Sequence, residues 1–183
     1  MTVSWSARQK ILLLLMTGLT LGLTRSPRHY FKILKNVPKA WREIERKALY
    51  RAVREFKKER LVDIVERKNG TLEMILNENG RKRALKYKLN ELEIKKPTKW
   101  DGKWRIVIFD IPEKIKRARE ALREKLRELG FKELQKSVFI HPFECKDEID
   151  FITKFFNLRP CIRLIRSDFI TNEAELKQWF KLS

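Results

Sequence analysis

The chain has 183 residues, of which 43% are hydrophobic, so it is long enough for one ordinary domain or two small ones with a packed core. Two cysteines and two histidines exclude a disulfide framework and a histidine-rich metal site, and they fit a reducing cytoplasm. Lysine and arginine number 43 against 24 acidic residues, giving a net charge of +19. This charge indicates a polyanionic partner, nucleic acid first and an anionic membrane second, rather than a merely soluble basic surface.

The basic excess is uneven along the chain. Residues 1–98 hold 24 basic and 10 acidic residues, whereas residues 99–183 hold 19 and 14. Residues 1–42 contain no acid. We therefore expect the main surface for a polyanion in the first half of the chain.

An apolar run, Ile11–Leu23, lies near the start of the chain. It follows Arg8 and Lys10 like the core of a signal peptide, but it is too short to span a bilayer, and no small-x-small cleavage site follows it. Because Ser6 can cap a helix that begins near Ala7, we expect the run to be the buried face of a first core helix. A targeting segment or a membrane anchor is the alternative.

A short helical stretch, His29–Lys35, is expected next, and the clearest helix of the sequence, Trp41–Lys58, follows it. One face of this helix is apolar at offsets of 0, 3, 4 and 7 residues, with Leu49, Ala52, Val53 and Phe56. The opposite face has a basic stripe, with Tyr50 on its flank. The basic stripe consists of Lys47, Arg51, Arg54 and Lys58.

Residues 61–76 contain two alternating apolar runs around Asn69-Gly70, which is the strongest short-range indication of a β-hairpin. Asn77 then caps a final short helix, in which Gly80 is a weak point. The predicted order is helix, helix, basic helix, hairpin, helix, as in a winged helix-turn-helix. In that fold the third helix enters the DNA major groove and the hairpin reaches the backbone or the minor groove. A solvated basic face is the alternative.

We therefore predict that residues 1–98 form a DNA-binding domain with a linker at its end. The expected contacts to double-stranded DNA are the basic stripe, Tyr50 beside it, and two residues of the wing. These residues are Lys47, Tyr50, Arg51, Arg54, Lys58, Arg67 and Lys68.

Residues 92–98 are charged and contain Pro97 without a clear period, so they are the predicted linker, and a second domain is expected over 99–183. Its expected elements are a strand over 104–110, a helix over 112–129, strands over 131–135 and 137–141, a helix over 146–158 and a strand over 161–165. The core face of the first helix is expected to be Ile115, Ala118, Leu122, Leu126 and Leu129. The order β-α-β-β-α-β is the ferredoxin-like arrangement, so the whole chain is expected to be α+β.

The second domain also resembles a known family. RIVIFDIPEKIKRAREALREKLRELGF followed by LQKSVFIHPFE is similar to the ferredoxin-like, nuclease-related family called CRISPR-associated protein two, over about residues 104–168. The shared pattern is an apolar strand ending in an aspartate, an arginine-rich helix ending at a glycine, and a Gln-x-Ser-Val-Phe strand. The matching residues are Asp110, Arg117, Arg119, Gly130, Gln135, Ser137, Val138 and Phe139.

The segment before this strand, KWDGKW, is similar to the central domain of PaaX-type transcriptional repressors, in which Trp-Asp-Gly-x-Trp leads into the same strand. The matching residues are Trp100, Asp101, Gly102 and Trp104. Those repressors carry a winged helix before this domain and a further domain after it, and we expect that further domain to be absent here. The resemblance implies a cytoplasmic repressor that binds DNA as a homodimer and dimerises through its ferredoxin-like domain.

Asp110 is the candidate catalytic and metal-binding residue. In the CRISPR family the strand-end aspartates of two protomers face each other, so the resemblance implies a Mg²⁺ ion at the dimer axis of a metal-dependent endonuclease. It also implies an alternative role as an adaptation scaffold whose partner is a CRISPR integrase. Against these, an aspartate before Ile111-Pro112 is also typical of a turn that starts a helix. We expect the repressor rather than the enzyme.

Overall fold

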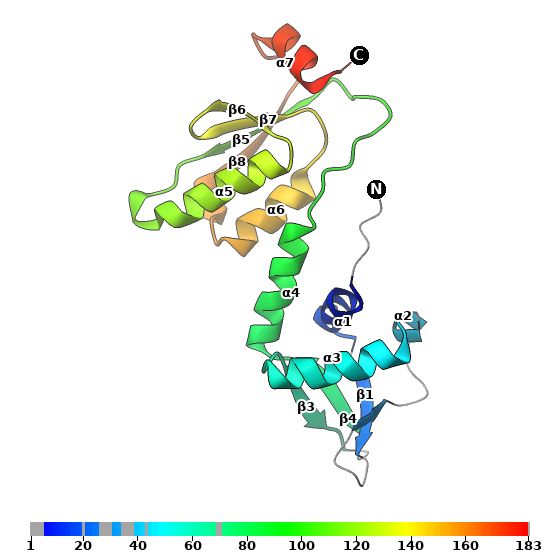
Figure 1. Cartoon of the computed structure of the whole chain (residues 1–183). Helices are drawn as coiled ribbons and strands as arrows, with labels where there is room; N and C mark the ends of the chain where they lie inside the picture. The colour runs from blue at the N-terminus through cyan, green and yellow to red at the C-terminus, as the bar shows by residue number, and fades with distance from the viewer. Residues whose placement is uncertain are drawn as a thin grey trace. The chain divides into compact units, whose positions relative to one another are not determined.

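The computed structural model describes residues 6–19, 21–25, 31–33, 39–42, 44–68 and 71–182. The chain divides into two compact units, Met1–Glu91 and Leu92–Ser183. Each unit combines helices with its own four-stranded antiparallel sheet (Figure 1). The chain is therefore an α+β protein. No helix in the described part of the chain is long and apolar enough to cross a membrane.

The first unit has a sheet in the order β2-β1-β4-β3, in which β3 and β4 form a hairpin. The predicted hairpin is therefore confirmed at both strands, while Asn69-Gly70 lies outside the described residues. The elements are α1 (Ala7–Met16), β1 (Leu21–Arg25), β2 (Phe31–Ile33), α2 (Lys39–Arg42), α3 (Arg46–Lys58), β3 (Val62–Glu66), β4 (Leu72–Leu76) and α4 (Glu78–Asn90).

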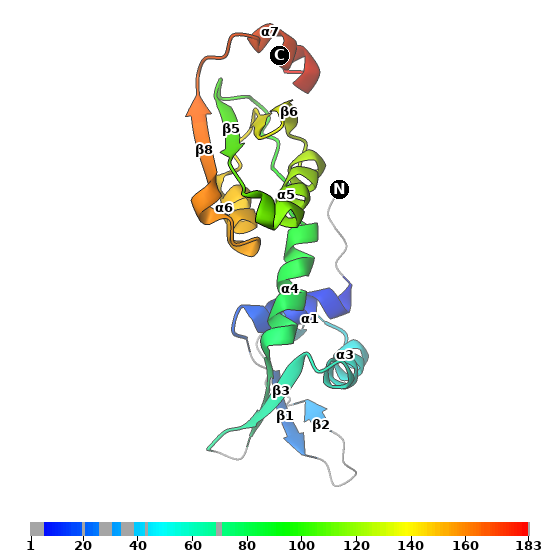
Figure 2. The same ribbon diagram turned by 90° about the vertical axis from the view of Figure 1, so that its left-hand side faces the viewer.

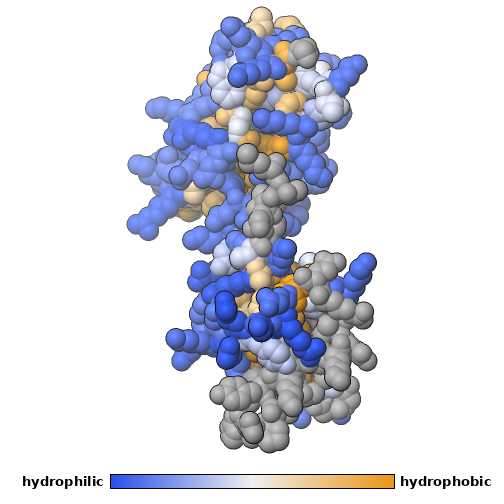
Figure 3. Space-filling view, turned by 45° about the vertical axis from the view of Figure 1, so that its right-hand side comes forward, coloured by the Kyte–Doolittle hydropathy of each residue, from blue (hydrophilic) through white to orange (hydrophobic). Residues whose placement is uncertain are grey.

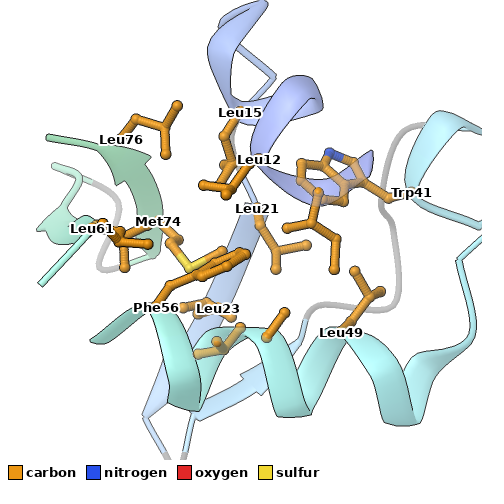
Figure 4. Packing of buried hydrophobic residues seen from close by; sticks show 14 of the residues in the cluster. Leu12, Leu15, Leu21, Leu23, Trp41, Leu49, Phe56, Leu61, Met74 and Leu76 are labelled. Carbon is orange, nitrogen blue, oxygen red and sulfur yellow. The ribbon is translucent and has the colours of Figure 1, made fainter. Parts of the chain in front are cut away.

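Apolar side chains from helices and strands meet in one core in this unit (Figure 4). Leu12 of α1, Leu23 of β1 and Phe56 of α3 are completely buried. Met74 of β4 and Trp41 of α2 are buried in the same cluster. Its members come from segments far apart in the sequence, so the core fixes the helices against the sheet.

The apolar run Ile11–Leu23 is not one helix, contrary to our prediction. Helix α1 begins as expected, because Ser6 and Gln9 form a reciprocal capping box, but it ends at Met16. Gly18 has a φ of 86°, which is a left-handed conformation that glycine adopts without strain and that stops the helix. Leu21 and Leu23 are both buried in β1, where alternate residues share one face.

Two further helix predictions in this unit need correction. Phe31–Ile33, expected within a helix, is the strand β2, while the remainder of 29–35 lies outside the described residues. The expected helix over 41–58 is two helices, α2 and α3. The chain is extended at Glu45, with φ −53° and ψ 133°, and Ile44 beside it is buried. The prediction joined the two helices because the apolar periodicity of α3 continues back through Ile44 to Trp41. Both residues are buried, although the chain leaves the helical conformation between them and α3.

The second unit follows the predicted β-α-β-β-α-β order, and its sheet has the order β6-β7-β5-β8. Figure 2 shows β8 beside β5 at one edge of this sheet. The elements are β5 (Trp104–Phe109), the 3-10 turn η1 (Glu113–Ile115), α5 (Lys116–Glu128), β6 (Lys132–Gln135), β7 (Val138–His141), α6 (Lys146–Phe155), the 3-10 turn η2 (Arg159–Cys161), β8 (Ile162–Ser167) and α7 (Glu173–Phe180).

Helices α5 and α6 lie on the same face of this sheet (Figure 1). Leu122 and Leu126 are buried as predicted, but Ile115 is 38% exposed because η1 interrupts the helical period before α5 begins. Helix α7 packs at the end of the sheet, where Leu176 joins Trp104 and Ile140. The segment 92–98 has neither helix nor strand and falls within this unit.

Candidate nucleic-acid interface

Helix α3 has the two faces that its sequence predicts. Leu49, Ala52, Val53 and Phe56 are buried in the core of the first unit. Lys47, Arg51, Arg54 and Lys58 of the basic stripe are all exposed. Because side chains spaced by three or four residues share one face of a helix, burial of the apolar face leaves the basic stripe open to solvent.

Two acidic residues at the C-terminal end of α3, Glu55 and the cap residue Glu59, are engaged by a cation from another helix, a feature that sequence reasoning missed. Arg8 of α1 pairs with Glu59 and, at 3.3 Å from its Nη1 to the carboxylate, with Glu55. The guanidinium also lies 5.3 Å from the centre of the Phe56 ring. The hydrogen bond from Arg8 lowers the pKa of Glu59 below its usual value, so this carboxylate stays charged and paired. Arg8 thus neutralises the two carboxylates at this end of α3, next to the basic stripe.

The structure places Tyr50 differently from the other predicted contacts. Its side chain is half-buried and packs against the core of the first unit. The buried part of Tyr50 packs against the core and stabilises α3, so only the remaining part can contact a ligand. Tyr50 therefore remains a predicted DNA contact only through its exposed part.

The two predicted wing residues differ from each other. Arg67 follows β3 and donates hydrogen bonds from Nε and Nη2 to Glu73 Oε2, at 2.8 and 2.6 Å. To bind a phosphate, Arg67 must share its guanidinium or give up this ion pair. Lys68 is exposed at the same end of the hairpin. Lys68 is therefore the more available of the two wing cations.

Hydrophilic residues predominate on the face of the first unit that Figure 3 presents. Helix α4 contributes further exposed cations, Arg81, Arg83 and Lys86. The charge of Arg83 lowers the pKa of Glu59 at the end of α3, so the cations of α4 act on the same region of the unit. This surface suits a polyanion, because several cations can each neutralise a phosphate.

Asp110 is exposed directly after β5. Its backbone N–H donates to the carbonyl oxygen of Cys161 at 3.0 Å, which fixes the backbone of the turn. Within the described ranges, no group of three or more histidine, cysteine, aspartate or glutamate side chains could hold a metal ion. Each chain supplies one carboxylate, Asp110, whereas Mg²⁺ takes one or two carboxylates together with phosphate and water. The metal site that the family resemblance implies would therefore need the Asp110 of a second chain as well.

The Trp-Asp-Gly-Lys-Trp segment is held in place by hydrogen bonds from the buried side chain of Arg105, the residue that follows it. Arg105, with 4% of its side chain exposed, donates from Nη1 and Nη2 to the two carboxylate oxygens of Asp101 at 2.8 and 2.7 Å. It also pairs with Glu144 at 3.0 Å and donates to the carbonyl of Pro142 at 2.9 Å. Trp100 Nε1 donates to the same carbonyl at 2.9 Å. Sequence reasoning found the motif but not the function of its arginine.

The fold and the basic surface together define a two-unit α+β protein. A basic unit of helices and a four-stranded sheet is followed by a unit in which α5 and α6 cover one face of an antiparallel sheet. Residues 97–178 match the family model of the PaaX protein central Cas2-like domain. The chain is accordingly consistent with a PaaX-type protein, and the family comparison gives no information on residues 1–96. No curated protein matches the chain significantly.

Proposed function

We propose that this chain is a PaaX-type transcriptional regulator that binds double-stranded DNA through its first unit and acts in the cytoplasm as a homodimer. The observation that carries the proposal is the basic stripe of α3, which is exposed while Glu55 and Glu59 at the end of the helix pair with Arg8. The family match to the second unit agrees with a regulator of this type.

The first unit would be a winged helix-turn-helix with one additional strand. Helix α1, strand β1, helices α2 and α3, and the β3–β4 hairpin follow one another in the order typical of that fold. Strand β1 pairs with β4, which brings the hairpin against the helices, and β2 extends the sheet beyond β1. In this interpretation α3 enters the major groove and Lys68 reaches the backbone from the wing.

The second unit would be a ferredoxin-like dimerisation domain. Its antiparallel strand order, β8-β5-β7-β6, suits that topology. On β5 and β8, Ile108 and Ile165 are 37% and 43% exposed. Ile106 pairs with Ile165, and Ile108 lies two residues further along β5, so these side chains share one face of the sheet. An apolar sheet face of this kind fits a second copy of the chain.

The proposal is tested by reversing two charges of the basic stripe, with Arg51→Glu and Arg54→Glu combined. We expect the affinity for a mixed-sequence DNA duplex to fall at least about 100-fold, because two phosphate contacts are replaced by repulsion. The affinity of the unchanged protein should also fall steeply with salt, and the slope should be smaller in the variant. Gel-shift titrations at several fixed salt concentrations measure both quantities.

The matched control is Lys146→Glu combined with Lys154→Glu, which makes the same change in net charge at two exposed positions of α6. Circular dichroism shows whether each variant folds. If a folded Arg51/Arg54 variant binds the duplex as tightly as the control does, the basic stripe is not the DNA-binding surface.

The endonuclease remains the second candidate because Asp110 is exposed at the end of β5 and could meet its counterpart in a dimer, with Mg²⁺ between the two carboxylates. Such a protein could also assemble with a CRISPR integrase. We expect no cleavage of RNA or DNA with Mg²⁺ or Mn²⁺ above that of Asp110→Ala, because one carboxylate per chain is a sparse metal site. Cleavage by the unchanged protein that Asp110→Ala abolishes would favour the endonuclease.

A further inference from the structure

The second unit contains a cavity beside its terminal helix. Four segments contribute to its lining: the linker 92–97, the end of α5, the end of β7 with Phe143, and the end of α7 with the residues after it. The apolar part includes Ile94, Phe143 and Phe180. The segment that joins the two units is thus also a wall of this cavity.

His141 is the polar side chain at the buried wall of the cavity. It is 3% exposed, and the ring centres of Phe131, Phe143 and Phe180 lie 4.9, 5.5 and 5.8 Å from its own. The backbone N–H of Phe143 donates to Nδ1 at 3.1 Å, which is shorter than the 3.4 Å from Nδ1 to the Phe143 carbonyl. We therefore assign Nδ1 as the acceptor and place the ring proton on Nε2.

The Nε2–H donor faces the cavity. A Cβ atom added to Gly130, another lining residue, would lie 3.9 Å from Nε2. No side chain or carbonyl in the described part of the chain accepts a hydrogen bond from this nitrogen. Nε2 is not one of the described buried side-chain atoms that lack a partner, so it is open to the cavity, where water or a bound ligand can accept its hydrogen bond.

The charges around the cavity favour an anion. Lys95, Lys96 and Lys181 line it together with Glu93 and Glu128. Glu128 is occupied by an ion pair with Lys125 at 2.9 Å. Lys96 and His141 line the same cavity, and the positive charge of Lys96 lowers the pKa of His141. The ammonium therefore lies close enough to interact with an anion bound at Nε2.

We propose that this cavity binds a small monocarboxylate with an apolar body. One carboxylate oxygen accepts the hydrogen bond from His141 Nε2–H, and the negative charge lies near Lys96. The apolar body packs against Ile94, Phe143 and Phe180, where it is removed from water. The proposal goes beyond the proposed DNA binding, since it concerns the second unit and is measured without DNA.

The test is a titration of the full chain with sodium benzoate and with sodium hexanoate. The chain has two histidines, so the side-chain nitrogen resonances of His141 can be assigned by comparison with His29→Gln. We expect saturable shifts of the His141 Nε2 resonance, with no shift of His29. Trp179, half-exposed at the cavity, should change its fluorescence, and Trp179→Phe identifies its contribution among the five tryptophans.

Two variants separate charge from hydrogen bonding. Lys96→Ala, at an exposed position, should weaken binding roughly two- to fivefold, as expected for an exposed ion pair. His141→Phe keeps an aromatic ring without the donor and should weaken it roughly tenfold or more. Lys114→Ala, an exposed lysine outside the cavity, is the matched control and should bind as the unchanged protein does.

Three results would overturn the proposal. The first is the absence of saturable binding into the millimolar range. The second is equal binding of benzamide and benzoate, since the site would then not select a negative charge. The third is a ligand effect that spares the His141 nitrogen, which would place the ligand elsewhere. The nitrogen titration uses the unchanged protein, so it decides the matter even if His141→Phe does not fold.

Discussion

Arg105, on strand β5, holds the Trp-Asp-Gly-Lys-Trp segment that precedes it against the sheet. Its ion pairs with Asp101 and Glu144 lower the pKa of both carboxyls, chiefly through the hydrogen bonds that Arg105 donates. Gly102, with a φ of 71°, allows the tight turn that returns Asp101 to Arg105. These contacts explain why aspartate and glycine stand between the two tryptophans, although the sequence alone offers only their resemblance to a family motif.

His141 leads to a prediction about pH. Burial, together with the nearby positive charges of Lys96 and Arg105, lowers the pKa of His141 from 6.5 to about 4, although its contact with Phe143 opposes the shift. The unfolded chain therefore takes up a proton between these values while the folded chain does not. The contribution of His141 to stability is complete above pH 6.5 and is lost as the pH falls toward 4.

We expect this loss to reach about 3 kcal/mol in the free energy of unfolding of the second unit. Urea denaturation of the unchanged protein and of His141→Gln, at several pH values between roughly 7.5 and 4, measures this loss of stability. The variant should lose most of this slope, whatever its absolute stability. An identical slope in both proteins would show that other groups cause the pH dependence.

At the scale of elements, the sequence predicted helices and strands well wherever one periodic face was buried. The apolar faces of α3 and α6 and the alternation of β3 and β4 correspond to packed surfaces. Residues 11–23 and 41–58 were predicted less well. In residues 11–23 the apolar run continues past the end of α1, which Gly18 at positive φ creates. In residues 41–58 the apolar period continues past the break between α2 and α3, where Ile44 is buried. Periodicity reports which face is buried, but it does not report where the chain turns.

Gly80 gives a prediction at the same scale. Glycine in the first turn of α4 costs helix propensity, so alanine would ordinarily stabilise such a helix. Here a Cβ on Gly80 would lie 2.0 Å from the backbone oxygen of Leu61 and 2.7 Å from a methyl group of Leu76. We expect Gly80→Ala to lower the free energy of unfolding of the first unit by about 1–3 kcal/mol, because backbone atoms must move to make room.

Chemical denaturation monitored in the first unit checks this effect. Asn79→Ala changes the exposed neighbouring residue of the same helix turn and should be neutral or slightly stabilising. If Gly80→Ala is as stable as Asn79→Ala, the close approach of α4 to Leu61 is not maintained in solution.

At the scale of the whole molecule, the proposed homodimer depends on the exposed isoleucines of the second sheet. Ile165→Glu places a charge on the face that Ile106 and Ile108 share. We expect dimerisation to weaken by roughly 2 kcal/mol or more, because a carboxylate would be buried without a partner. Sedimentation at several protein concentrations measures the change. Ile115→Glu, at a similarly exposed isoleucine on η1, should leave the dimer intact.

The sequence by itself determined the basic excess of the first half, the two faces of α3, the hairpin, the element order of the second unit and its family resemblance. Each of these follows from local composition or from a short period, which neighbouring residues are enough to define. Only the tertiary structure decided that Arg8 neutralises Glu55 and Glu59, that Glu73 engages Arg67 and that His141 lines a cavity. These contacts join residues through folding of the chain, and their partners have no fixed spacing that a sequence pattern could reveal.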